Sequence, residues 1–95
     1  MIPDIETLMV FARALKGEPL QTIWRKKTFY INLIGDDLEF IPVSSRAPRR
    51  ERYDQIKALL DELTETGSFR KSDYADLSFN ASYVLALVKQ WQTAQ

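Results

Sequence analysis

Residues 21–43 read QTIWRKKTFYINLIGDDLEFIPV, and this stretch predicts the β part of the fold. Its two apolar runs are rich in β-branched and aromatic residues, and the GDD between them is typical of a hairpin turn. Alternation along a strand places three apolar side chains on one face: Phe29, Ile31 and Leu33. The same alternation places four further side chains on the opposite face: Trp24, Lys26, Thr28 and Tyr30.

The second strand of this hairpin is expected to lie at a sheet edge, or to end at Pro42, because proline has no N–H for a ladder hydrogen bond. A lone hairpin is only marginally stable in water. A third strand, contributed by dimerisation through an edge, would stabilise it. A homodimer is therefore one predicted partner.

Helices are predicted on both sides of the hairpin. They cover residues 3–16, 48–66, 72–77 and 81–93, and Asn80 is the expected N-cap of the last one. The resulting element order is α-β-β-α-α-α. It predicts a small single domain of the α+β class, residues 1–95, in which about four helices pack on an antiparallel hairpin or small sheet.

The composition fits one folded domain. The 95 residues are enough for one hydrophobic core and too few for two domains. Hydrophobic residues make up 45% of the chain and charged residues 27%, which excludes a disordered tail. The net charge is zero, and this argues against a protein that coats nucleic acid without selectivity.

Neither cysteine nor histidine occurs in the chain. Their absence excludes disulfides, thiolate nucleophiles, zinc sites that use Cys or His, and Ser-His-Asp triads. Three clustered carboxylates at the hairpin turn are of the type that binds Mg²⁺: Asp36, Asp37 and Glu39. The lysine that nucleases place after such acids is missing, because Phe40 and Ile41 follow. We predict no enzyme, no metal and no cofactor, and a weak metal-dependent hydrolase is the least favoured hypothesis.

The chain is expected to be cytoplasmic. No run approaches the roughly 18 apolar residues of a membrane span. The N-terminal MIPDIETLMVFARALKG has early acids and no basic leader, so no signal peptide is predicted.

Residues 69–91, FRKSDYADLSFNASYVLALVKQW, have the outline of a helix-turn-helix motif. With Ala75 as its small residue, Phe79 falls where the motif has glycine, and a shift by one residue misplaces the first helix. The last helix is mostly apolar and has Lys89 as its only basic residue, whereas a reading helix presents polar side chains to base edges. We therefore predict that it is the main hydrophobic helix. Three basic residues of the stretch remain as backbone contacts: Arg70, Lys71 and Lys89.

The strongest binding signal is SSRAPRRER, residues 44–52. The predicted helix places Arg49, Arg50 and Arg52 in its first turn, where cations oppose the helix dipole. Free N–H groups at a helix start favour anions, and guanidinium binds phosphate through two parallel hydrogen bonds. Aromatic residues among lysines upstream are typical of surfaces that stack bases. The candidate nucleic-acid or anion site comprises Ser44, Ser45, Arg46, Arg49, Arg50, Arg52, Lys26, Lys27, Trp24 and Tyr30.

The sequence thus predicts a non-enzymatic binding protein that holds nucleic acid or a phosphate backbone through an arginine-rich helix N-terminus. Two alternatives stay open. The arginines form a solvated or ion-paired cluster with the acids of the hairpin turn, or the chain is a small protein-interaction or assembly accessory protein. Such a protein, of the kind that mobile elements encode, would bind no nucleic acid.

Overall fold

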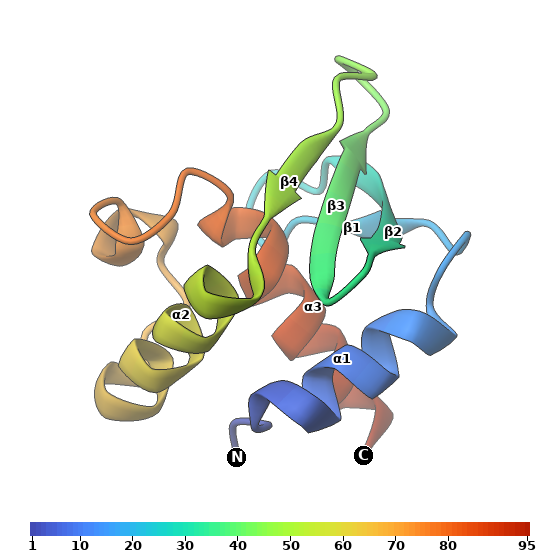
Figure 1. Ribbon diagram of the computed structural model, residues 1–95. Helices are drawn as coiled ribbons and strands as arrows, with labels where there is room; N and C mark the ends of the chain where they lie inside the picture. Colours follow the sequence, from blue (N-terminus) through green and yellow to red (C-terminus); the bar gives the residue numbers. More distant parts are fainter.

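The computed structural model describes residues 1–95 as a four-stranded antiparallel sheet with three α-helices (Figure 1). Each strand pairs with the next along the chain, in the order β1-β2-β3-β4. The strands are β1 Leu20–Gln21, β2 Thr28–Ile34, β3 Asp37–Pro42 and β4 Arg49–Glu51. The helices are α1 Ile5–Ala14, α2 Tyr53–Thr66 and α3 Ala81–Ala94, and a short 3₁₀ helix, η1, covers Lys71–Tyr74. The predicted α+β class is confirmed.

The hairpin of β2 and β3 has the alternation that its sequence predicts. Phe29 and Ile31 are buried, and Leu33 packs against the same core. Ile31 lies opposite Phe40, so the apolar faces of the two strands coincide. The strand β3 ends at Pro42, as expected, but it is internal to the sheet because β4 pairs with its other side.

The largest departure from prediction is β4. Residues 49–51 pair with β3 and do not form the first turn of a helix, so α2 begins only at Tyr53. Backbone groups that a first helical turn leaves without partners instead enter the sheet ladder. The predicted order α-β-β-α-α-α is not confirmed, because it lacks β1 and β4. The predicted four helices are not confirmed either: the structure has three α-helices, and a short 3₁₀ helix, η1, lies where the helix 72–77 was predicted. The chain supplies its own additional strands, β1 and β4, which removes the physical reason for a dimer through a sheet edge.

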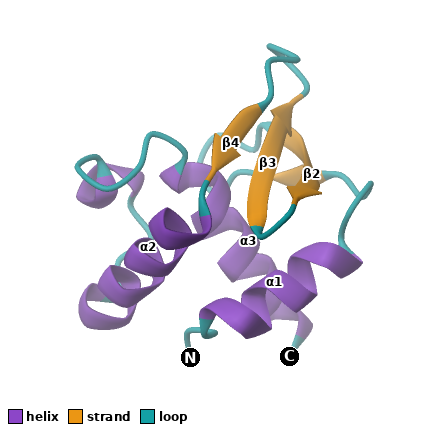
Figure 2. Ribbon diagram, viewed as in Figure 1, coloured by secondary structure: helices purple, strands orange, loops and turns teal.

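The helices gather on one side of the sheet, and no helix crosses in front of β3 and β4 in Figure 2. The helix α3 is the most deeply buried of them, as predicted. Its buried large side chains are Val84, Leu85, Leu87, Val88 and Trp91. Asn80 occupies the N-cap position, but its side chain does not cap the helix and donates instead to the Arg50 carbonyl oxygen at 3.3 Å. No helix is long and apolar enough to cross a membrane.

Gly67 is the C-cap residue that follows α2, and its φ of +67° is left-handed. A Cβ at this position would meet no atom within 4 Å, so a side chain there has only a conformational cost. We expect Gly67→Ala to lower the free energy of unfolding by about 1 kcal/mol, measured by urea denaturation. Gly67→Asn should cost less, because asparagine tolerates the left-handed conformation. Equal stability of G67A and the unchanged protein would contradict this.

Candidate nucleic-acid interface

The structure separates the predicted site residues. Arg50 pairs with Glu39, and Tyr30 with Ile41, so both side chains lie on the face of the sheet opposite the core. Trp24 and Lys26 precede β2, which begins at Thr28, so strand alternation does not place them beside Tyr30. Three exposed residues belong to the loop between β3 and β4, at the top of Figure 1: Ser44, Ser45 and Arg46.

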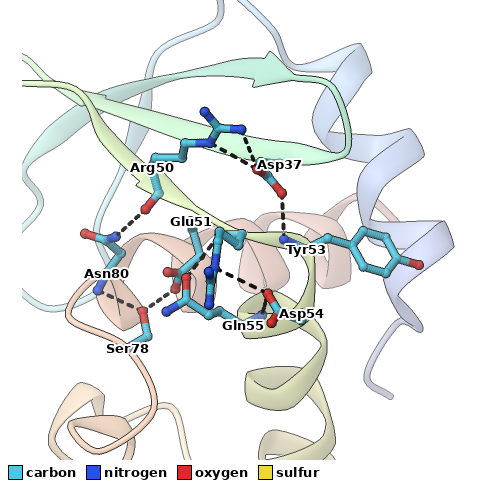
Figure 3. A network of polar contacts seen from close by, with 9 residues as sticks. Asp37, Arg50, Glu51, Tyr53, Asp54, Gln55, Ser78 and Asn80 are labelled. Atoms are coloured by element: carbon cyan, nitrogen blue, oxygen red, sulfur yellow. Dashed lines mark hydrogen bonds and ion pairs between the residues drawn. The ribbon is translucent and has the colours of Figure 1, made fainter.

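Arg50 has a structural partner. Its Nη2 and Nε atoms donate to one carboxylate oxygen of Asp37 at 2.7 and 3.0 Å, and the other oxygen accepts from the Tyr53 N–H at 2.9 Å (Figure 3). The hydrogen bonds from Arg50, and then that from Tyr53, hold the pKa of Asp37 below its usual value. The carboxylate therefore ties β3 to β4 and receives the first N–H of α2. Arg50 therefore has the kind of contact that the ion-paired alternative predicts.

The structure also places two other groups that the sequence singled out: Arg52 and the acids of the hairpin turn. Arg52 occupies the N-cap position of α2, where its Nε lies 3.6 Å from a carboxylate oxygen of Asp54 at the exposed surface. No group of three or more Asp or Glu side chains converges as a metal site. Asp37 is turned towards Arg50 and the start of α2, so the carboxylates of the hairpin turn do not form the cluster that their spacing indicated.

Three of the predicted residues, Trp24, Lys27 and Arg49, meet at a pocket of about 260 Å³ that the sequence alone did not reveal. It lies between the β1–β2 loop, β4, the segment before α3 and the first turns of α3. Four cations line it: Arg25, Lys27, Arg49 and Lys71. Four aromatic rings line it as well: Trp24, Phe69, Phe79 and Tyr83. We call these eight residues the basic–aromatic pocket.

The cations of the basic–aromatic pocket have no anionic partner. The three ion pairs of the molecule join other residues, namely Arg50–Asp37, Arg52–Asp54 and Lys57–Asp61. No Asp or Glu lines the pocket. The side chains nearest to the pocket therefore contribute charge of one sign only, which attracts anions into a concave surface.

The aromatic rings divide into a packed floor and an exposed rim. On the floor, Tyr83 stacks on Phe40 with 5.3 Å between ring centroids, and the Arg49 guanidinium lies 5.9 Å above the Tyr83 ring. At the rim, Trp24 is 73% exposed and Phe79 is 96% exposed. Two large aromatic side chains are thus in contact with water beside the pocket, where their ring faces are accessible to a ligand.

A second, more open hollow of about 480 Å³ adjoins the basic–aromatic pocket, because Thr22 and Ile23 line both. It adds Lys26 and Lys89, and it too has no acidic lining residue. The Lys89 ammonium lies 5.0 Å from the centroid of Phe69, a ring of the first pocket. Both hollows are thus lined by cations without acids, and they share two lining residues.

A buried polar network holds the walls of the pocket in place (Figure 3). Ser78 donates its hydroxyl to the Glu51 carboxylate, and the same hydroxyl accepts the Asn80 N–H at 2.9 Å. Glu51 is only 2% exposed, and this burial raises its pKa in spite of the hydrogen bonds from Ser78 and Asn80. Arg49 belongs to the same strand as Glu51, and Phe79 lies between Ser78 and Asn80 in the sequence. The network therefore holds β4 against the segment before α3 that contains Phe79.

Of the predicted site residues, Trp24, Lys27 and Arg49 are brought together at the pocket, and Lys26 lies in the adjoining hollow. Arg25 adjoins the predicted Trp24, and Lys71 was predicted separately as a backbone contact. The other pocket residues, Phe69, Phe79 and Tyr83, come from segments distant in the sequence. Phe79 carried the clearest signal, as an apolar residue inside a polar turn. Comparisons with protein families, with curated proteins and with solved structures found no match for this chain.

Proposed function

We propose that this protein is a non-enzymatic binding protein that holds nucleic acid, or another chain of phosphates, in the basic–aromatic pocket. The observation that supports it is the set of four unpaired cations around a pocket with no acidic residue. Guanidinium and ammonium groups bind phosphate oxygens through charge-assisted hydrogen bonds, which are about twice as strong as neutral ones. The site differs from the predicted helix N-terminus, since Arg49 acts from a strand.

The distribution of acids supports the same proposal. The net charge is zero, yet four exposed acidic side chains occupy one helix, α2: Asp54, Asp61, Glu62 and Glu65. None of these four acids lines either hollow, so they do not offset the cations that line them. We also propose that the protein is cytoplasmic. The homodimer remains a prediction, which light scattering of the purified protein would test.

The double variant Lys27→Ala/Arg49→Ala tests this function. We expect it to bind a labelled oligonucleotide more weakly than the unchanged protein, because two phosphate contacts are lost. The plot of log affinity against log salt concentration should become shallower by about 1.4, that is, by roughly 0.7 for each contact to a single strand. Fluorescence anisotropy over a salt series measures both quantities.

The matched control is Arg13→Ala/Lys16→Ala, which removes the same two residue types from exposed positions at the end of α1. It should leave affinity and salt dependence nearly unchanged, because neither residue lines the two hollows. The proposal fails if the unchanged protein binds no oligonucleotide at low salt, or if both double variants lose affinity equally.

A further inference from the structure

We propose that the ligand of the basic–aromatic pocket is single-stranded nucleic acid, with its bases stacked on Trp24 and Phe79. This inference rests on the proposed function and narrows it to one form of nucleic acid. The exposed rings at the rim of the pocket support this inference. Phosphate binding needs only cations, so it does not explain two aromatic side chains exposed to water. Trp24 lies in the turn after β1, and Phe79 lies in the turn before α3.

Exposed rings select for unpaired bases. In a duplex each base is stacked on its neighbours, so only its edges are accessible in the grooves. In a single strand the base faces are free, and a base stacked on an aromatic side chain contributes about 1–3 kcal/mol. Trp24 and Phe79 offer ring faces to solvent, which is the type of contact that a single strand uses.

The molecule also presents no helix suited to reading a duplex. Entry into the major groove needs a projecting helix or a two-stranded ribbon with polar side chains directed at base edges. The best candidate helix, α3, has Val84, Leu85 and Leu87 in the core. Most of its surface is therefore unavailable to a groove.

The two hollows provide a path for a backbone. Thr22 and Ile23 line both of them, so the cations of the first continue into those of the second, Lys26 and Lys89. Successive phosphates of one strand repeat along a line, and a positively charged groove that follows this line is typical of single-strand binding. We infer that the single-stranded nucleic acid crosses the β1–β2 loop. Its bases would lie on the rim of the pocket and its phosphates against the lysines and arginines.

The emission of Trp24 reports directly on stacking. Oligo(dT), the same sequence paired in a duplex, and inorganic polyphosphate, which has charges but no bases, are titrated separately into the protein. We expect oligo(dT) to quench the emission and to bind at least about tenfold more tightly than the duplex, as one stacked base predicts. The variant Trp24→Phe keeps an aromatic ring, so it should still bind oligo(dT). It should lose the quenching, which would assign the quenched emission to Trp24. The other tryptophan, Trp91, is buried and is left unchanged.

Two double variants separate stacking from charge. Trp24→Ala/Phe79→Ala should weaken oligo(dT) binding about tenfold or more while polyphosphate binding stays the same. The control Val10→Ala/Val43→Ala removes two other exposed apolar side chains and should change neither. If duplex and single strand bind equally and the aromatic variant loses nothing, this inference is overturned while phosphate binding stands. If neither nucleic acid nor polyphosphate binds, the proposed function fails as well, and a protein partner becomes the better explanation of the exposed rings.

Discussion

Phe40→Ala is expected to lower the free energy of unfolding by about 3–5 kcal/mol, the usual cost of removing a buried aromatic ring. Phe40 is 0% exposed, lies edge-on to Phe29 at 5.9 Å and stacks on Tyr83. The whole stability of a domain of this size is typically about 5–15 kcal/mol. The variant should therefore unfold at a much lower urea concentration, because its cavity lies where the sheet meets α3.

Phe79→Ala is the matched control for this prediction, since the chemical change is identical. Phe79 is 96% exposed, so its removal leaves no cavity, and we expect a change within about 0.5 kcal/mol. Urea denaturation of both variants, followed by far-ultraviolet circular dichroism, gives the comparison. A loss for Phe40→Ala as small as that expected for Phe79→Ala would show that the ring cluster under Tyr83 does not stabilise the fold.

Ser78→Ala is expected to cost about 3 kcal/mol at a pH where Glu51 is ionised. The substitution removes a hydroxyl that donates to a carboxylate in the protein interior, and an unsatisfied buried group costs about 1–3 kcal/mol, more when it is charged. The cost should be smaller at low pH, where the carboxyl is protonated and needs less stabilisation. Urea denaturation of the variant across a pH series measures this difference, and a cost independent of pH would contradict it.

The pH dependence of the unchanged protein has a defined sign. Because the pKa of Glu51 is raised in the folded state, folded chains bind its proton more tightly than unfolded chains do. Stability should therefore fall as the pH rises from the unfolded pKa of Glu51 through the folded one. Glu51→Gln removes the titrating group, so its stability should be flat over the same range. An equal decline in E51Q would assign the pH dependence to another group.

Asp37 contributes a pH dependence of the opposite sign. Its pKa is lowered, chiefly by Arg50, so the stability that it contributes is present above the unfolded pKa and is lost as the pH falls through the folded one. This loss of stability at low pH should persist in E51Q, because Asp37 receives its hydrogen bonds from Arg50 and Tyr53 and not from Glu51. Urea denaturation of E51Q across the pH series would therefore separate the contribution of Asp37 from that of Glu51.

The sequence predicts those parts of the fold in which periodicity is strong. The apolar alternation around Phe29 and Ile31 indicated the hairpin, and the apolar run before Trp91 indicated the main core helix. The strand β4 was missed because Arg49 and Arg50 are exposed and Glu51 is buried, a pattern that does not resemble a half-apolar strand. Its pairing is fixed by β3, a tertiary partner that no local propensity reports.

The site was predictable only in part for a related reason. The sequence identified Trp24, Lys27 and Arg49 by residue type, because cations and aromatics near one another favour nucleic acid. It placed Arg50 with them, although strand alternation sends neighbouring side chains to opposite faces and leaves Arg50 to pair with Asp37. Phe79 approaches these residues only after the chain between β4 and α3 has folded.

The lengths of the outer strands have a consequence for behaviour at high concentration. The sheet is bounded by β1 with two residues and by β4 with three. Unpaired strand edges are templates for aggregation when they are long, flat and apolar, and natural proteins suppress this with short or charged edges. Here one edge is too short to template a neighbour and the other carries Arg49 and Arg50, so concentrated solutions should resist amyloid-like association.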